Sequence, residues 1–409
     1  MTHSRPQPMG SLLGVNGVMF LSFVGFSATQ FHGYLFERQG RTPLEIGMLF
    51  CAGFSAGIAA PLAQVKAIRW LRGPRRPLQL MLGGAGFSLA LLPYFHSFLP
   101  MAMLFFLTLF CSSSIHPLNT ACALEVTRSR GTGFYFLIRA LGTLGFLAGC
   151  LMSFANPDPQ FLPHLYSGFA CAFFAAMLFV SWGLKPVDPQ EAPEDIEVTP
   201  HPLLAPSFKR ALRMLSTPQP KRFLWTLGLM NFANSMATLV QGNYLTTRFH
   251  GGQAAISLAW IISSTCEIPL MLFCAWLVRK SGLRAVIGFG LLGTALKLVW
   301  IGLANSKDLY FIGLMAHGCF FSGALVGFNL YVEQRYPVRD RPTLQALGAL
   351  FYQGLPMALG GLVAGLLWHF VSIRAVYWVA GILGMGVAVY TPFLLTLLPN
   401  PEFPSRQFP

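Results

Sequence analysis

The feature that most constrains this 409-residue chain is a series of twelve apolar stretches, each of about 20 residues. A helix of that length crosses the ~30 Å hydrocarbon core of a bilayer, where the backbone must satisfy its hydrogen bonds within the segment. Hydrophobic residues make up 54% of the chain and charged residues only 10%, which excludes a soluble globular domain. We therefore expect an all-α integral membrane protein with twelve transmembrane helices, at 12–35, 44–64, 78–97, 99–124, 134–155, 164–184, 223–246, 254–278, 285–304, 309–332, 343–370 and 375–398.

A polar, proline-rich segment separates these stretches into two blocks of six. We expect an N-terminal six-helix bundle at 1–184, a cytoplasmic linker at 185–222 and a C-terminal six-helix bundle at 223–409. In both blocks a short basic loop joins the second and third spans. Two pseudo-symmetric halves in parallel orientation are typical of transporters that bind their substrate near the middle of the membrane, between the halves.

The net charge of +14 reports topology rather than nucleic-acid binding, because the basic residues are spread over loops and do not form a patch on a polar domain. With the N-terminus inside, most lysines and arginines fall in inner loops. By the positive-inside rule both termini are expected in the cytoplasm, with the protein in the plasma membrane, as in a bacterial inner membrane. The basic residues of the outer loops are Arg38, Arg41, Arg248, Lys307 and Arg374.

Neither processing nor a bound metal is expected. The first apolar stretch is longer than the core of a cleavable signal peptide, so we interpret it as an uncleaved first helix. All eight cysteines fall within the expected spans and show neither a disulfide framework nor metal-ligand spacing. The sequence therefore predicts no metal and no other cofactor.

Ionisable residues inside the spans are the leading candidates for function, because a charge in hydrocarbon is costly to maintain. Arg139 lies in the fifth span, Glu267 and Lys297 in the middle of the eighth and ninth, and His317 in the tenth. A buried carboxyl must be paired or protonated, and a group that gains and loses a proton is what ion coupling requires. Structural roles stay open: Arg139 can snorkel, Glu267 and Lys297 can form a static pair, and His317 can be a hydrogen-bonded packing residue.

Several neutral polar side chains are candidates to line a cavity, although each could equally bridge two helices. Those taken as substrate-binding candidates are Asn119, Gln241 and Gln353. Small residues at helical spacing, such as Gly142, Gly145 and Gly149, are better explained by close helix packing.

Four segments together give the chain a family resemblance. They are Arg-Ala-Leu-Gly-Thr-Leu-Gly at 139–145, Glu267, Lys297, and Leu-Met-Ala-His at 314–317. Because of these residues and their spacing, the whole chain resembles the major facilitator superfamily. Within that superfamily it resembles the branch of oligosaccharide/proton symporters and phenylpropionate-permease-like proteins. The resemblance implies that Arg139 contacts substrate in a central cavity, and that Glu267, Lys297 and His317 take part in proton coupling.

Departures from the sugar-transporting members indicate a different substrate. The corresponding stretch of the fourth span, at 117–121, has no acid to pair with Arg139, which leaves that arginine available to an anion. Phe146 stands where the sugar symporters carry a tryptophan, and can stack on a ring without an indole donor. Phe320 replaces their tenth-span carboxylate, so Glu267 is the only acid in the middle of a span. These changes favour a carboxylated, aromatic ligand over a polyhydroxylated one.

The sequence thus predicts a monomeric secondary transporter that takes up a small organic anion, such as an aromatic carboxylate, with protons. Its other partners are the small-molecule substrate and the lipid bilayer. A proton-coupled sugar or nucleoside symporter, an efflux pump for amphipathic compounds and a transport-inactive membrane sensor remain alternatives. An enzyme is not expected, because the spans carry neither an acid cluster for a metal nor a nucleophile with a base.

Overall fold

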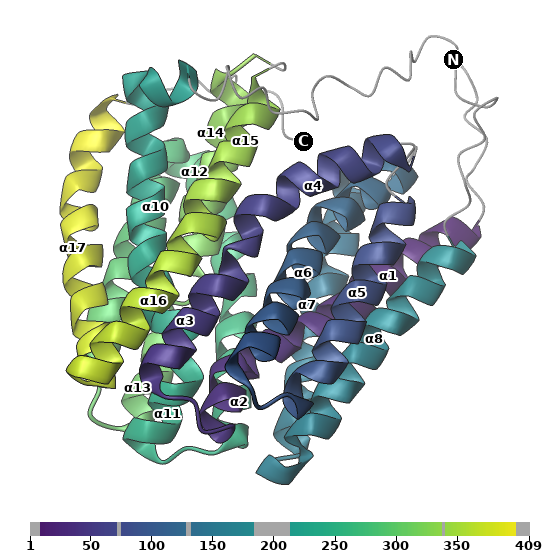
Figure 1. Cartoon of the computed structure of the whole chain (residues 1–409). Helices are drawn as coiled ribbons and strands as arrows, with labels where there is room; N and C mark the ends of the chain where they lie inside the picture. Colours follow the sequence, from purple (N-terminus) through teal and green to yellow (C-terminus); the bar gives the residue numbers. More distant parts are fainter. Residues whose placement is uncertain (1–8, 72–74, 128–131, 184–212, 338–339, 398–409) are drawn as a thin grey trace. The chain divides into compact units, whose positions relative to one another are not determined.

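The computed structural model describes residues 9–71, 75–127, 132–183, 213–337 and 340–397, and every regular element in these ranges is helical (Figure 1). The first helices are α1 Met9–Phe26, η1 Ser27–Phe31, α2 His32–Arg38, α3 Pro43–Phe54, α4 Ala56–Trp70, α5 Arg75–Leu91, η2 Leu92–Tyr94, α6 Phe98–Thr127, α7 Thr132–Ala155, η3 Pro159–Phe161 and α8 Leu162–Gly183. They are followed by α10 Pro218–Leu239, α11 Gln241–Phe249, α12 Gln253–Leu303, α13 Lys307–Leu314, η5 Cys319–Leu325, α14 Val326–Arg335, α15 Arg341–Ala349, η6 Leu350–Gly354, α16 Leu355–Phe370 and α17 Ile373–Leu397.

The described helices group into two compact units. Unit 1 holds α1 to α8 together with the start of α12, up to Ile261. Unit 2 holds α10, α11 and the chain from Ile262 onward. The predicted boundaries of the two bundles, with a linker at 185–222, stay a prediction because most of that segment lies outside the described residues.

The all-helical membrane class is confirmed, and each of the twelve predicted spans coincides with helix. Within the described residues, eight helices are long and apolar enough to cross a membrane, or nine if the bent pair α10 and α11 counts as one span. One of the eight is α12, whose 51 residues contain two predicted spans. The helices do not by themselves establish the number of crossings, and twelve stays a prediction.

Several helices of unit 2 depart from regular α-helical geometry. The backbone of α12 breaks at Gly282, whose φ of 80° is readily adopted only by glycine. A bend of 47° separates α10 from α11. The segments η5 and η6 are π-helical, a local widening often found at functional sites. Unit 2 therefore contains several places where backbone groups leave the regular helical pattern.

In unit 1, small residues let α7 approach α1 closely. A methyl group placed on Gly145 would collide with the carbonyl of Phe20, and one placed on Gly142 would lie 3.1 Å from the ring of Phe23. A methyl group on Gly149 would lie 2.7 Å from Cβ of Ser27. The predicted role of these glycines in close helix packing is confirmed, since an added methyl group would clash at Gly145 and Gly149 and make a tight contact at Gly142.

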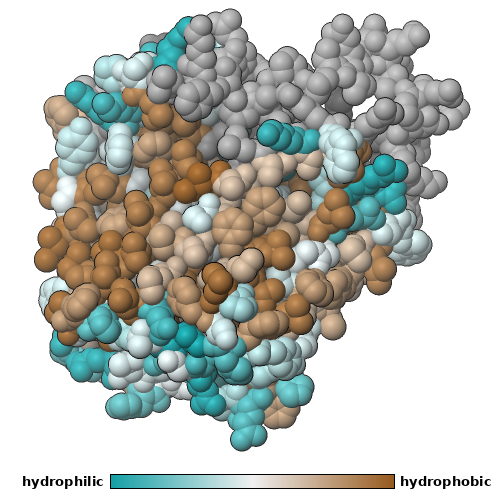
Figure 2. Space-filling view, in the orientation of Figure 1, coloured by the Kyte–Doolittle hydropathy of each residue, from teal (hydrophilic) through white to brown (hydrophobic). Residues whose placement is uncertain are grey.

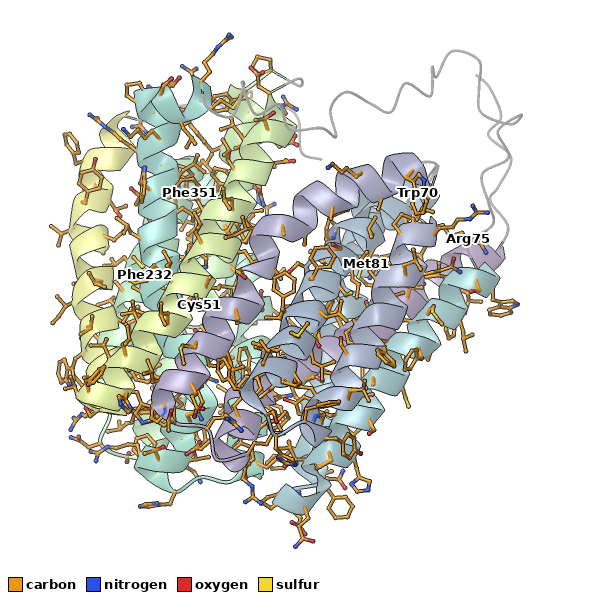
Figure 3. All side chains as sticks on the ribbon, viewed as in Figure 1. Cys51, Trp70, Arg75, Met81, Phe232 and Phe351 are labelled. Atoms are coloured by element: carbon orange, nitrogen blue, oxygen red, sulfur yellow. The ribbon has the colours of Figure 1, made fainter. Side chains whose placement is uncertain are left out.

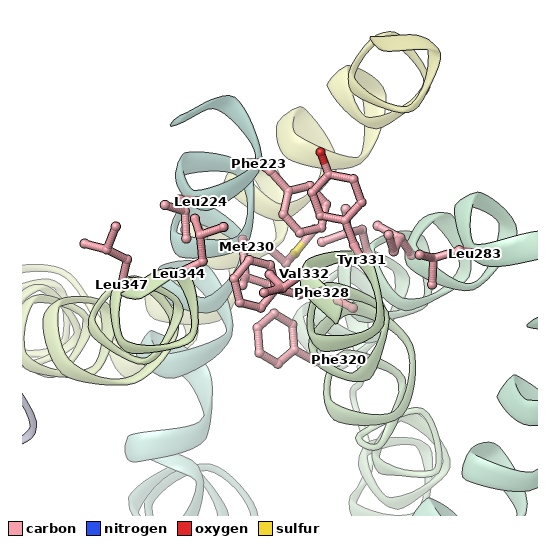
Figure 4. Packing of buried hydrophobic residues seen from close by; sticks show 14 of the residues in the cluster. Phe223, Leu224, Met230, Leu283, Phe320, Phe328, Tyr331, Val332, Leu344 and Leu347 are labelled. Atoms are coloured by element: carbon pink, nitrogen blue, oxygen red, sulfur yellow. The ribbon is translucent and has the colours of Figure 1, made fainter. Parts of the chain in front are cut away.

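Unit 2 is held together by an apolar cluster between α10, α12, α14 and α15 (Figure 4). The rings of Phe223 and Phe328 stack at a centroid distance of 5.4 Å, and Tyr331 lies beside them. Where η5 crosses α12, a methyl group on Gly323 would lie 2.6 Å from Cα of Gly290. Contact between two glycines brings the π segment directly against the helix that carries Lys297.

Candidate functional site

The centre of unit 2 contains a buried lysine held by polar side chains of another helix. Lys297, on the second half of α12, is 3% exposed, and its Nζ donates a hydrogen bond to Asn234 Oδ1 at 2.6 Å. Asn234 Nδ2 donates to Asn231 Oδ1 at 3.3 Å, and Asn231 Nδ2 donates to the carbonyl of Tyr352. A continuous chain of hydrogen bonds therefore joins α12, α10 and η6.

Local geometry explains why these residues meet. Asn231 and Asn234 are three positions apart on α10, so both side chains lie on one face of that helix. Tyr352 lies within the π-helical segment η6, where the changed backbone pairing frees carbonyls that neighbouring side chains can satisfy. Asn231 supplies such a donor, so the chain of hydrogen bonds that leads to Lys297 begins at a backbone carbonyl.

His317 lies where its span loses regular helical structure. Between α13 and η5, residues 315–318 form turns, and the amide of His317 bonds to the carbonyl of Leu314 rather than one turn further back. His317 is 6% exposed and interacts electrostatically with Lys297. Broken helices at this depth are typical of substrate and ion sites in transporters, where unwound backbone is tolerated because it lines the site.

Glu267 approaches the same break from the first half of α12. A methyl group on Gly318 would lie 2.9 Å from Cα of Glu267, so the two backbones are in direct contact one residue from His317. On the other side, a methyl group on Gly293 would lie 2.7 Å from Cys319 Sγ, one helical turn before Lys297. The break in the tenth span thus lies between the helix segments that carry Glu267 and Lys297.

The predicted substrate-binding residues are distributed differently. Asn119 is 2% exposed and donates from Nδ2 to Ser22 Oγ at 3.0 Å, which joins α6 to α1. Phe146 packs edge-on against Trp260 with a centroid distance of 5.9 Å. Gln241 is buried at the start of α11, and Gln353 is exposed in η6. Whether any of them contacts a substrate stays a prediction.

Arg139 lies on α7, but its side chain falls outside the described residues. Among the described residues there is no group of three or more His, Cys, Asp or Glu side chains that could hold a metal ion. In the described part of unit 2, the ionisable residues Lys297, Glu267 and His317 lie on neighbouring segments, and their part in proton coupling stays a prediction.

Comparison with known proteins identifies the family of the chain. The family model described as MFS_1 like matches residues 12–379, nearly the whole chain. The protein belongs to the MFS_1 like family. It is therefore a multi-pass secondary transporter of the major facilitator superfamily, a class of transporters rather than enzymes.

Individual relatives of this MFS_1 like protein are distant. The chain is 25% identical over 286 residues to the uncharacterized transporter YwbF of Bacillus subtilis (strain 168), an alignment that covers 68% of this chain and 67% of YwbF. Among solved structures, the nucleoside transporter NupG matches with a TM-score of 0.79 and 15% identity, covering 93% of this chain and 98% of NupG. The human organic anion transporter MFSD10 matches with a TM-score of 0.64 and 18% identity, covering 95% and 100%. These two structures support the fold alone.

Two of these contacts, one in each unit, could not be identified from the sequence of the MFS_1 like protein. Tyr352 takes part through its carbonyl, which no side-chain pattern reveals. Trp260 is one of many aromatic residues in the spans, and only the structure pairs it with Phe146. The two asparagines did leave a signal, since polar residues three apart on an apolar helix share a face.

Proposed function

We propose that the protein is a proton-coupled symporter that takes up a small organic anion, such as an aromatic carboxylate, by alternating access. The observation that carries this proposal is the buried ammonium of Lys297, whose hydrogen bond goes to the neutral amide of Asn234. An amide oxygen orients the ammonium but adds no negative charge. The positive charge therefore remains available to attract an anion within a site of low dielectric.

The energetic cost of this arrangement supports a functional role. Burying an ion costs several kcal/mol even after the surroundings relax, and a hydrogen bond to a neutral group offsets only part of that cost. Apolar residues of similar volume would often serve stability as well or better. Lys297 is therefore more readily explained by transport than by packing.

Proton coupling is assigned to Glu267, His317 and Lys297 acting together. The three groups lie on helix segments that meet at the break at 315–318. When one of them takes up a proton, the charge balance in the cluster changes, and with it the affinity for a substrate anion. Coupling requires that proton and substrate favour the same conformation, since a ligand shifts an equilibrium only by its differential affinity for the two states.

Recognition of the rest of the substrate is assigned to unit 1. The rings of Phe146 and Trp260 supply an aromatic pair against which a planar ligand can pack. Arg139 would bind a carboxylate through two parallel N–H donors. We place the protein in the plasma membrane as a monomer, with both termini in the cytoplasm and two six-helix bundles at 1–184 and 223–409 joined by the linker at 185–222.

The test is proton movement into proteoliposomes on addition of substrate, without an imposed gradient. Aromatic carboxylates should make the outside medium alkaline, and sugars and nucleosides should not. If sugars or nucleosides made the medium alkaline instead, the substrate would be a sugar or nucleoside and not an organic anion. A silent panel, with folded protein, would contradict proton symport and favour efflux of another compound class or a sensor.

Replacing the mid-membrane acid should separate coupling from binding. We expect Glu267→Gln to reduce gradient-driven accumulation to the level of protein-free vesicles, because the amide cannot carry the proton. Counterflow exchange of substrate should persist. The matched control is Glu333→Gln, which removes an exposed carboxylate that pairs with Arg341 and should leave accumulation intact. Accumulation by Glu267→Gln would remove this residue from coupling.

The identity of the cation in the fifth span tests anion recognition. Arg139→Lys keeps the positive charge but loses the planar pair of donors that matches a carboxylate. We expect the apparent affinity for the substrate to fall about tenfold, which corresponds to about 1.4 kcal/mol. An unchanged affinity in a binding titration would contradict carboxylate recognition by Arg139.

A further inference from the structure

A groove runs along the outside of unit 2 between α10 and α17. It encloses about 530 Å³, and α10 and α17 are antiparallel neighbours along it. One wall carries Trp225, Leu229 and Phe232, and the other carries Ile382 and Leu383. Figure 2 shows this face, at the left of the view, as an apolar surface over α10 and α17.

A glycine and an aromatic contact shape the groove. Gly386 is an exposed residue of the groove lining, and a methyl group placed there would meet no atom within 4 Å. On the facing wall Trp225 packs edge-on against Phe351 at a centroid distance of 5.3 Å, which fixes the position of its ring. Phe232 and Phe351 lie at different heights along this part of unit 2 (Figure 3). An apolar groove with open space beside Gly386 suits a hydrocarbon chain.

One end of the groove is positively charged. Lys221 and Arg222 line it there, and both side chains are exposed. The guanidinium of Arg222 lies 5.9 Å from the ring centroid of Phe393, which holds the charge above the groove mouth. Tyr390 also lines this end and lies against Phe393. Aromatic and basic residues together mark the level of the lipid headgroups.

The length of the groove matches one leaflet. Ten residues of α10 separate Arg222 from Phe232, which corresponds to about 15 Å at the helical rise of 1.5 Å per residue. That is about half of the hydrocarbon thickness. A lipid whose phosphate contacts Lys221 and Arg222 would therefore place one acyl chain along the whole groove.

We propose that this groove binds an anionic phospholipid, with its headgroup phosphate at Lys221 and Arg222 and one acyl chain between α10 and α17. Basic pockets at the cytoplasmic ends of membrane helices recognise anionic headgroups, and the expected topology puts the start of α10 on that side. A zwitterionic lipid fills the same channel but adds no net charge for the two cations to attract. The site is separate from the polar cluster around Lys297 and does not depend on the transported substrate.

The test measures lipid retention by the purified full-length protein in native mass spectrometry. Phosphatidylglycerol and phosphatidylcholine with identical acyl chains are titrated in turn. We expect one phosphatidylglycerol to be retained at least about tenfold more tightly than phosphatidylcholine. Each cation should contribute about fivefold, so Lys221→Gln with Arg222→Gln should weaken phosphatidylglycerol about 25-fold.

A second variant tests the chain-binding part. Gly386→Trp places an indole ring in the groove and should release both lipids, whereas Val389→Trp, on the same helix, 75% exposed and outside the groove lining, should release neither. The charge control is Arg213→Gln with Lys280→Gln, two exposed cations of unit 2 outside the groove. All variants are first compared by thermal unfolding, so that a misfolded protein is not scored as a loss of binding.

Three results would overturn the proposal. They are equal retention of the two lipids by the wild type, unchanged retention by Gly386→Trp in a folded protein, and a lipid-independent dimer that Gly386→Trp dissolves. The last result would identify the groove as a contact between two copies of the chain. Failure of transport in any variant bears on the proposed function and not on this site, because the readout is retained lipid.

Discussion

The two units accommodate buried polar groups in different ways. In the described part of unit 1, neutral side chains pair across helices: Asn119 with Ser22, and Thr108 with Ser88. In unit 2 the buried chain of hydrogen bonds ends on a charge, Lys297. Neutral pairs satisfy each other where they lie and can serve packing alone. A buried charge needs an opposite charge to balance it, so it is retained where a charged ligand or a proton comes and goes.

The largest effect should follow removal of that charge. Lys297→Met keeps an unbranched side chain of similar length but removes the ammonium that Asn234 accepts from. We expect substrate accumulation in proteoliposomes to fall to the level of empty vesicles. Stability should change by no more than about 1 kcal/mol, because the lost hydrogen bond is offset by the removed cost of burying an ion. Thermal unfolding in detergent measures this second quantity.

Lys307→Met is the matched control, since it removes an exposed lysine from the first turn of α13. It should leave both accumulation and unfolding unchanged. A Lys297→Met protein that still transports but unfolds far more readily would show that unit 2 uses its charge for stability, as unit 1 uses its neutral pairs. The distinction between the two units would then be lost.

The overall class of this protein could be predicted from sequence because membrane helices depend on composition over long windows. Apolar length, the proline-rich interruption and the distribution of basic residues are all visible without coordinates. Lys297, Glu267 and His317 could be singled out for the same reason, since a charge in an apolar stretch stands out. These features can be recognised from neighbouring residues alone, because the bilayer makes apolar length favourable and a buried charge costly wherever they occur.

The partners in the site could not be predicted, because they depend on helix breaks. The turn at 315–318 and the π segment η6 arise from packing between helices, and neither has a sequence signal as clear as a proline. Asn119 shows why residue type alone leaves the role open: it suits a ligand site, and the structure also gives it a contact with Ser22 that joins two helices, so its part in substrate binding stays a prediction. Residue type indicates what a side chain can do, and only its neighbours decide what it does.

The next largest effect tests the close packing of α7 against α1 in unit 1. Gly145→Ala places a methyl group against the backbone carbonyl of Phe20, so α7 and α1 must separate, at an expected cost of about 1–3 kcal/mol. The matched variant is Gly386→Ala in unit 2, where a methyl group meets no atom within 4 Å. It should be neutral or stabilise its helix by up to about 1 kcal/mol. Equal unfolding temperatures for the two variants would contradict the packing role of Gly145.

The smallest expected effects on stability come from removing one buried asparagine side chain in each unit. Asn119→Ala and Asn234→Ala each remove an interhelical hydrogen bond, which in membranes contributes about 0.6 kcal/mol on average. The loss of unfolding free energy should be about this size for Asn119→Ala and larger for Asn234→Ala, because the second variant leaves a buried ammonium without its acceptor. Transport should separate them. Asn119→Ala should transport normally, whereas Asn234→Ala leaves the ammonium of Lys297 without its acceptor and should lower transport strongly. If instead Asn119→Ala weakened substrate binding without loss of stability, Asn119 would be a substrate ligand as its residue type predicts, and unit 1 would contribute chemistry as well as packing.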